Sequence, residues 1–374
     1  MARAVLTKLL LAAGLTGLLT WGASLDAADA DRRSLSLSVE PLVPVAERTA
    51  MRVAAVTLER AGRSHFYARR GGHWRCLSLF DADVRAGDLQ RLVDTALNAS
   101  GVVQSVDPER FADYDIGNDA CWTVTLHGGA VLKDEDRDVL FALELGDALP
   151  SLNAGFARVV GDDRVLLLDS DPRDSFAPGG RIGGAVPLID PHVMPEYWPP
   201  AGQRVDRVVV ERVGVLPYYI ELRDVETTEE ERSAGKAPFE WVTVHQGGSE
   251  STPSPDHAIA YSVFLRLATI VGVDDGVKAA DYGLEQGSFV GRVGLRTSAG
   301  EELNLLFGRA LADGRVPMLT TLARPVLFVT GEMAELFLPA SEALDDPVAD
   351  NPWEPFLMEA SRTMLEATTS RVPR

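Results

Sequence analysis

Cysteine is scarce in this chain, with only Cys76 and Cys121 among its 374 residues. Two cysteines cannot form a zinc site of the all-cysteine kind. Both lie beside tryptophans, in segments that we interpret as strands. In an oxidising compartment they either pair, closing a loop worth about 4 kcal/mol in the chain-entropy model, or remain two buried free thiols.

Positive charge is also in short supply, since 36 Lys and Arg stand against 55 Asp and Glu, for a formal net charge of −19. A field of this sign repels phosphate backbones and anionic lipid head groups. No basic cluster offsets it locally, so we expect no nucleic-acid partner. We interpret the excess of acidic residues mainly as a feature that keeps the protein soluble. The hydrophobic fraction of 46% is that of a globular protein.

Short catalytic motifs are missing as well. There is no Gly-x-Ser-x-Gly elbow, no phosphate-binding glycine loop with lysine, and no His-Glu-x-x-His helix. The acidic stretches Asp169–Asp171 and Asp345–Asp346 lack the spaced ligands of a calcium loop, so we interpret them as solvated turns. The six histidines are scattered singly: His65, His73, His127, His192, His245 and His257. The sequence therefore predicts no catalytic, cofactor-binding or metal-ligating residue, and no cofactor.

The N-terminus carries the clearest functional signal. Arg3 and Lys8 precede a charge-free apolar stretch from Leu9 to Leu25. Such a pattern is typical of export, because the charge stays cytoplasmic while the run enters the bilayer. The run is short for a spanning helix, which needs about 20 residues. Residues 1–30 are therefore predicted to be either a retained anchor or a signal cut after Ala27–Ala30. The remainder is expected to face the periplasm, with membrane contact through this segment only.

A faint internal repeat follows. Phe111–Ile116 (Phe-Ala-Asp-Tyr-Asp-Ile) recurs as Ala279–Leu284 (Ala-Ala-Asp-Tyr-Gly-Leu). Upstream of each copy, Trp74 and Trp241 each end a strand-like stretch. Tyr114 and Tyr282 also repeat, and we interpret both as packing residues, because repeated residues in repeated folds usually pack.

An amphipathic helix is expected between the tryptophan and the tyrosine of each copy. Asp83 is a plausible N-cap of the first helix; for the second, Ser254 is the plausible N-cap and Pro255 the first helical residue. The predicted buried stripe of the first helix is Leu89, Leu92, Val93, Ala96 and Leu97. That of the second is Ile259, Val263, Phe264, Leu267 and Ile270.

Strands are predicted after each tyrosine. Apolar and polar residues alternate over 122–127 and over 292–296, as in half-buried strands. Further strands are expected at 139–145 and 165–168 in the first copy, and at 303–307 and 326–329 in the second. Each copy is therefore predicted to run strand–strand–helix–strand–strand–strand. We expect an α+β fold: two tandem copies of a mainly antiparallel sheet with one packed amphipathic helix, after the N-terminal membrane or signal segment.

These patterns divide the chain into the N-terminal segment, residues 1–30, and four further parts. Residues 45–170 form the first repeat module, 171–204 a Pro/Gly-rich linker, 205–341 the second module, and 342–374 a C-terminal helix and tail. An acidic loop from Glu226 to Lys236 is expected within the first hairpin of the second module. The predicted tail helix places Leu357, Ser361, Met364 and Leu365 on one side.

Four short motifs stand in order along the chain: Gly72-His73-Trp74, Ala82-Asp83, Asp281-Tyr282-Gly283-Leu284 and Leu305-Leu306-Phe307-Gly308. With these motifs in this order, the chain resembles the tandem-repeat family catalogued as domain-of-unknown-function family number 4340. The resemblance covers residues of about 50–170 and 205–340, and the first copy departs from it with Asp115-Ile116 in place of Gly-Leu. It implies a membrane-anchored protein on the outer face, found beside gliding-motility-type ABC transport systems, whose family has no attributed catalytic residues.

Two functions remain in view. The first is a non-enzymatic extracytoplasmic adaptor or binding subunit, accessory to an ABC-type transport or gliding-type system, with a membrane protein such as an ABC transporter component as partner. The second is an extracytoplasmic hydrolase that uses a carboxylate pair outside any known motif. A hydrolase should have a deep pocket with convergent carboxylates, whereas an adaptor should have exposed apolar patches or sheet edges.

Overall fold

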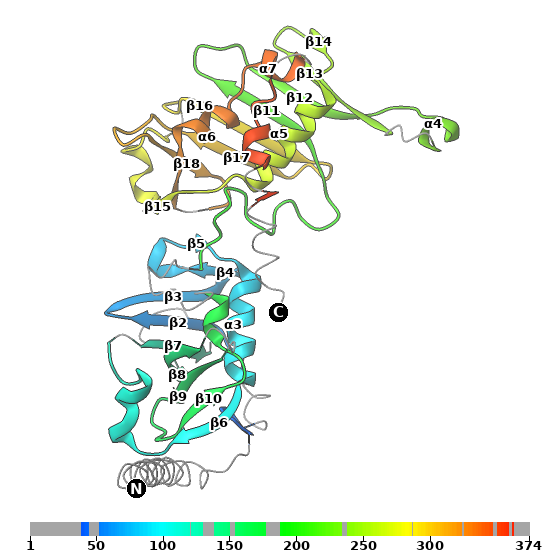
Figure 1. The fold of residues 1–374 in the computed structure, drawn as a ribbon. Helices are drawn as coiled ribbons and strands as arrows, with labels where there is room; N and C mark the ends of the chain where they lie inside the picture. Colours follow the sequence, from blue (N-terminus) through cyan, green and yellow to red (C-terminus); the bar gives the residue numbers. More distant parts are fainter. Residues whose placement is uncertain are drawn as a thin grey trace, which may run out of the picture. The chain divides into compact units, whose positions relative to one another are not determined.

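The chain folds into two compact units, seen in a computed structural model (Figure 1). The first unit comprises residues up to His73 together with Ala86–Leu188, and the second comprises Trp74–Arg85 together with the residues from Ile189 onward. The structure describes residues 39–44, 52–119, 121–129, 138–149, 154–176, 188–233, 238–285, 287–323, 325–346, 350–358 and 361–362. The predicted export segment, residues 1–30, lies outside this set. Within the set, no helix is long and apolar enough to span a membrane.

A ten-stranded antiparallel sheet is the first of two sheets. From edge to edge its strands are β1 (Val39–Pro41), β6 (Ser100–Ser105), β10 (Val165–Leu168), β9 (Ala154–Val159), β8 (Asp138–Leu149), β7 (Trp122–Gly128), β2 (Ala55–Arg60), β3 (Arg63–Arg70), β4 (His73–Cys76) and β5 (Ala82–Asp83). The alternation predicted at 122–127 is confirmed, since Trp122, Val124 and Leu126 are buried on β7. Strands β6 and β9 were not predicted.

Helix α3 (Ala86–Asn98) is the first predicted helix. Leu89, Leu92, Val93 and Ala96 are buried, as expected, while Leu97 is half-buried. The predicted N-cap Asp83 is wrong, because this residue lies in β5 and its carboxylate accepts from Arg75 at 2.6 Å. Burial raises the pKa of Asp83, and the neighbouring guanidinium of Arg75 opposes that rise.

A nine-stranded antiparallel sheet belongs to the second unit. Its strands, in spatial order, are β14 (Glu250–Ser251), β13 (Phe239–His245), β12 (Tyr218–Asp224), β11 (Val205–Arg212), β16 (Gly291–Thr297), β17 (Glu302–Phe307), β18 (Arg315–Thr320), β19 (Val326–Thr330) and β15 (Gly272–Asp274). Together the two sheets and their few helices confirm an α+β class with antiparallel strands. Strands β15 and β18 were not predicted.

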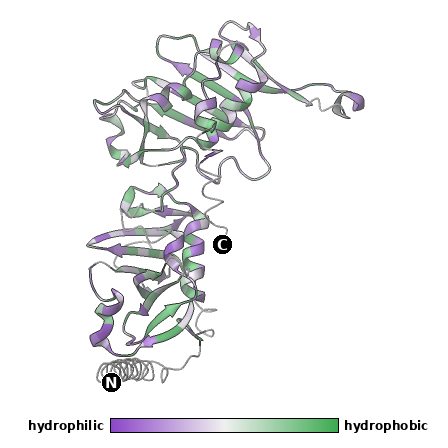
Figure 2. Ribbon diagram, in the orientation of Figure 1, coloured by the Kyte–Doolittle hydropathy of each residue, from purple (hydrophilic) through white to green (hydrophobic). Residues whose placement is uncertain are grey.

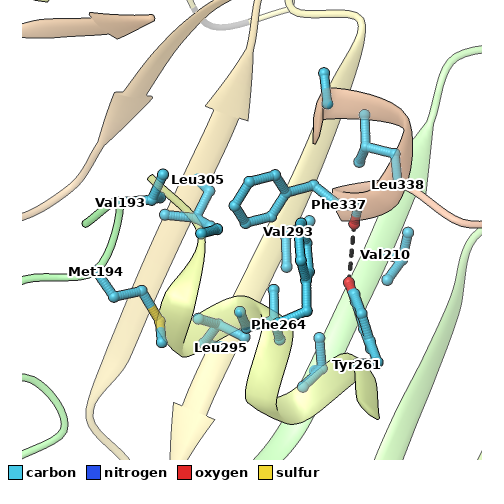
Figure 3. Close-up of a cluster of buried hydrophobic side chains, with 14 of the residues drawn as sticks. Val193, Met194, Val210, Tyr261, Phe264, Val293, Leu295, Leu305, Phe337 and Leu338 are labelled. Carbon is cyan, nitrogen blue, oxygen red and sulfur yellow. Dashed lines mark hydrogen bonds between the residues drawn. The ribbon is translucent and has the colours of Figure 1, made fainter. Parts of the chain in front are cut away.

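One face of the second sheet is covered by helices α5 (Pro255–Leu267), α6 (Gly331–Phe337) and α7 (Ser341–Asp345). Tyr261 and Phe264 on α5 are fully buried against this face (Figure 3). The Tyr261 hydroxyl donates to the Phe337 carbonyl at 2.8 Å, which gives this buried polar atom a partner. The close-packed aromatic cluster fixes α5 on the sheet.

The segment between the two sheets is partly built into the second unit. Val193, Met194 and Trp198 are buried in its hydrophobic core. Earlier in the same stretch, Arg173 and Asp171 form a buried ion pair at 2.8 Å within the first unit. Residues 177–187 of the predicted linker lie outside the described residues.

The acidic loop predicted at 226–236 lies between β12 and β13, which pair as an antiparallel hairpin. Within it, α4 (Glu229–Ser233) stands at the end of an extended arm (Figure 1). The α4 ribbon is hydrophilic (Figure 2).

Both thiols are free and buried, at Cys76 in β4 and at Cys121 just before β7. Burial raises the pKa of each thiol, so neither is activated as a thiolate. The pairing left open by the sequence is thus not formed in this structure.

Candidate functional site

An open groove of about 540 Å³ runs between helix α5 and the C-terminal segment. We call it the α5 groove. It is lined by Ser254, Asp256, His257, Ile259, Ala260, Val263, Asp350, Asn351, Glu354 and Leu357. All of these residues belong to the second unit.

Trp353 anchors the C-terminal wall of the groove. Its side chain is fully buried, and its indole Nε1 donates to the Leu336 carbonyl at 3.1 Å. The ring packs against Tyr261, with centroids 5.1 Å apart, and meets the His257 ring edge-on at 6.3 Å. Because Tyr261 is itself part of the core, the wall is held at a fixed distance from α5.

Two apolar residues of α5 face the groove instead of the core. Ile259 is 56% exposed and Val263 is 37% exposed. The predicted stripe is therefore wrong at these positions, and also at Ile270, which lies beyond the end of the helix. The sheet instead receives Ala260, Tyr261, Phe264 and Leu265. Because α5 is apolar on both sides, periodicity alone could not select the buried face.

Helix α3 provides an internal comparison. Like α5 it has 13 residues and packs on a sheet, but the fifth and ninth residues of the two helices differ in character. They are Gln90 and Asp94 in α3, where the amide donates to the carboxylate at 2.9 Å, and Ile259 and Val263 in α5. A sheet-packed helix of this length therefore does not need an apolar outer face.

Three exposed carboxylates line the α5 groove, on Asp256, Asp350 and Glu354. Among the described residues, no lysine or arginine lines it. His257 is 4% exposed, and its Nδ1 lies 2.9 Å from the Ala343 carbonyl. Because a carbonyl only accepts, this nitrogen carries a proton and the ring is held by the backbone. The groove thus has an apolar floor, formed by Ile259, Val263 and Leu357, and a negative border, formed by the three carboxylates.

A serine, a histidine and an aspartate also meet, at a place that sequence reasoning missed. The Ser251 hydroxyl donates to Asp345 Oδ2 at 2.5 Å and lies 3.0 Å from His245 Nε2. The same His245 nitrogen lies 3.6 Å from Asp345 Oδ2. In a Ser-His-Asp relay the aspartate holds the opposite ring nitrogen. Here both the Ser251 hydroxyl and the Asp345 carboxylate lie beside Nε2, so the cluster ties α7 to β13 and β14 and does not have the geometry of that triad.

The acidic stretches seen in the sequence are occupied by structural contacts. Asp169 accepts from the Ser100 hydroxyl at 2.7 Å, and Asp171 pairs with buried Arg173. Asp345 also accepts from the Thr243 hydroxyl at 2.9 Å. Among the described residues, no group of three or more His, Cys, Asp or Glu side chains is arranged to hold a metal ion.

The two repeated tyrosines each donate to the strand that follows the helix of their unit. The Tyr114 hydroxyl reaches the Gln104 carbonyl on β6 at 3.4 Å, and the Tyr282 hydroxyl reaches Asp274 Oδ2 on β15 at 2.6 Å. The Lys278 ammonium also donates to Asp274, at 2.9 Å. The hydrogen bond from Tyr282 makes the largest contribution, followed by that from Lys278, and together they lower the pKa of Asp274 to about 2.

Comparison with known proteins does not extend this description: no family model, no curated protein and no solved structure matches the chain.

Proposed function

We propose that this chain is a non-enzymatic adaptor or binding subunit that holds a partner protein in the α5 groove. One observation carries the proposal: Ile259 and Val263 are exposed where the matching positions of α3 are polar. Fully burying such a side chain contributes about 1.5–3 kcal/mol. At their exposed fractions, a partner that covers them gains about 1 kcal/mol from each. That gain is available only on binding, because the core is complete without them.

The location proposed for the adaptor rests on the N-terminal sequence alone. The positive end and apolar run of residues 1–30 motivate export across, or anchoring in, the cytoplasmic membrane, with the folded units on the periplasmic side. The resemblance to domain-of-unknown-function family number 4340 adds the expectation of a membrane protein partner, such as an ABC transporter component. A reporter fused after Arg374 should be active only outside the cytoplasm, and cytoplasmic activity would refute the export hypothesis.

We also propose that the two sheets, each with its packed helix, are copies of one module. From the strand that follows the helix, the first sheet runs β6, β10, β9, β8, β7, β2, β3, β4, β5. The second sheet runs β15, β19, β18, β17, β16, β11, β12, β13, β14. In each, that strand lies beside the last strand of the copy, and the strands before it follow in reverse chain order as far as β7 or β16. The strands that precede the helix then follow in chain order, β2 to β5 in the first sheet and β11 to β14 in the second. Trp74 on β4 and Trp241 on β13 occupy corresponding strands.

A matching backbone contact supports the same relation. A Cβ added at Gly146 would collide with the Tyr114 carbonyl oxygen, and one added at Gly308 would collide with that of Tyr282. Each tyrosine is followed by a residue with positive φ, 57° at Asp115 and 67° at Gly283. Gly308 belongs to a motif of the family resemblance, and Gly146 is its counterpart in the first copy. At each of these glycines the backbone passes close to the turn that carries the repeated tyrosine.

Site-directed photocrosslinking in intact cells tests the adaptor function. A photoreactive residue placed at Ile259 should form a light-dependent adduct with a partner protein, and adding Val263→Asp should abolish that adduct. The matched control carries the same photoreactive residue at Gln90, the fifth residue of α3, and should give no adduct. No adduct from Ile259, or equal adducts from both positions, would refute the proposal.

The hydrolase alternative is distinguished by the carboxylates of the groove. The three test variants are Asp256→Asn, Asp350→Asn and Glu354→Gln. If any one of them abolishes cellular function while the folded chain still reaches its location, the adaptor proposal is refuted in favour of a hydrolase with a catalytic carboxylate. For an adaptor, each single change should weaken function only partly, because no one side chain carries the chemistry.

A further inference from the structure

We infer that the occupant of the α5 groove is a cationic amphipathic α-helix of the partner protein, an assignment that rests on the proposed adaptor function. The groove joins two features that select this occupant. Its apolar floor follows the spacing of a helix, and the exposed charges of its described lining are all negative.

The floor is narrow and lies along one helix. Ile259 and Val263 stand one turn apart on α5, with Ala260 between them, while Leu357 faces them from the C-terminal wall. Two apolar side chains about 6 Å apart match residues at i and i+3 or i+4 of a second helix. Proteins that bind an amphipathic helix hold its apolar face in a groove that offers apolar residues at this spacing.

The charges determine the polar part of the occupant. Asp256, Asp350 and Glu354 border the floor, and in the part of the chain that the structure describes no lysine or arginine joins them in the lining. A bound helix with Lys or Arg beside its apolar residues would meet opposite charge on docking. The net charge of −19 would also speed its approach at low ionic strength.

The same charges disfavour the other occupants. Anionic lipid and nucleic acid are repelled by three carboxylates. A second copy of this chain would bring three more carboxylates against the first three, which is unfavourable at an interface. A small apolar ligand would remain largely in water, because the groove is open, whereas small-molecule sites bury most of the ligand surface.

A defined peptide tests the inference. The probe is a fluorescent helical peptide of leucine and lysine, about 15 residues long, with leucines at i, i+3, i+4 and i+7. Its acidic counterpart has glutamate in place of every lysine. Binding of each peptide to the full chain in nonionic detergent is measured by fluorescence anisotropy at several salt concentrations. The peptide partitions into detergent micelles to the same extent in every sample. Differences in its dissociation constant between variants of the chain therefore report on binding in the groove.

The basic peptide should bind the wild-type chain, and the acidic peptide should not. The double variant Ile259→Gln, Val263→Asp places on α5 the residue types that α3 has at the matching positions. It should raise the dissociation constant of the basic peptide at least tenfold, which corresponds to about 1.4 kcal/mol. The triple variant Asp256→Asn, Asp350→Asn, Glu354→Gln should also weaken binding and flatten its salt dependence. Urea midpoints close to wild type show that the variants are folded.

The matched control removes the same number of charges elsewhere. Glu226, Glu229 and Glu230 are exposed on the α4 arm and do not line the groove. Their triple replacement by glutamine should leave the dissociation constant within about twofold of wild type, which is less than half the free-energy change of a tenfold loss. An equal loss in this control would overturn the inference, because bulk charge would then explain the binding.

Two further outcomes separate this inference from the adaptor function. If the crosslink from Ile259 forms but the groove variants bind the basic peptide as wild type does, the cationic helix is refuted and the adaptor stands. If light scattering shows a dimer that Ile259→Gln with Val263→Asp dissociates, a second copy is the occupant and the inference is again refuted. Absence of the crosslink refutes the adaptor function itself.

Discussion

Replacing Trp353 by alanine should release the wall of the α5 groove and destabilise the second unit. The side chain is fully buried, its indole donates to the Leu336 carbonyl, and its ring packs on Tyr261. Truncation of a buried tryptophan to alanine costs about 3–5 kcal/mol, from lost burial and the cavity left behind. For a unit of this size, that lowers the midpoint of thermal unfolding by about 6–20 °C.

Trp353→Phe separates the two contributions to that cost. It keeps most of the ring contact but removes the indole donor, leaving the Leu336 carbonyl without this partner, so we expect a loss of about 1–3 kcal/mol. The control is Met358→Ala on the same segment, where the side chain is 68% exposed and the expected change is within about 0.5 kcal/mol.

Urea unfolding followed by circular dichroism, with the leucine–lysine peptide as a second probe, measures these effects. Trp353→Ala should lower the transition of the second unit, leave that of the first unchanged, and abolish peptide binding. If Trp353→Ala changed stability by less than about 1 kcal/mol, the tryptophan would not anchor the wall. The geometry of the groove would then need another explanation.

Two further predictions concern the second unit. Since Tyr282 and Lys278 hold the folded pKa of Asp274 at about 2, below its unfolded value of about 3.9, its stabilisation is full above about pH 5 and is lost as the pH falls towards 2. Urea midpoints at pH 5 and pH 2.5 should therefore differ less in Asp274→Asn than in wild type, and an equal difference would contradict this. Gly308→Ala should cost about 1–3 kcal/mol, because the added methyl meets the Tyr282 carbonyl. Gly87→Ala in α3 has open space and should be neutral or stabilising, so equal losses would refute the steric argument.

Strands with a strong two-residue alternation were predictable from the sequence. Trp122, Val124 and Leu126 are separated by threonines, and that pattern needs no knowledge of the partner strands. The strands β6 and β9 escaped prediction because each is rich in small or polar residues, as in Ser-Gly-Val-Val-Gln-Ser of β6. Such segments become strands because they hydrogen-bond to a neighbouring strand on each side, and those neighbours are present only in the assembled sheet.

The candidate site shows the same division. The sequence by itself determined the acidic balance, the strong strands and the buried face of α3, because each follows from residue type and local periodicity. It could not determine which side of α5 is buried, since Ile259 and Val263 fit one helical stripe and Tyr261 and Phe264 fit another. Packing against the second sheet selected the larger aromatic pair, which fills the core, and left the two aliphatic residues outside. The groove arose only when Trp353, far along the chain, brought the C-terminal segment beside them.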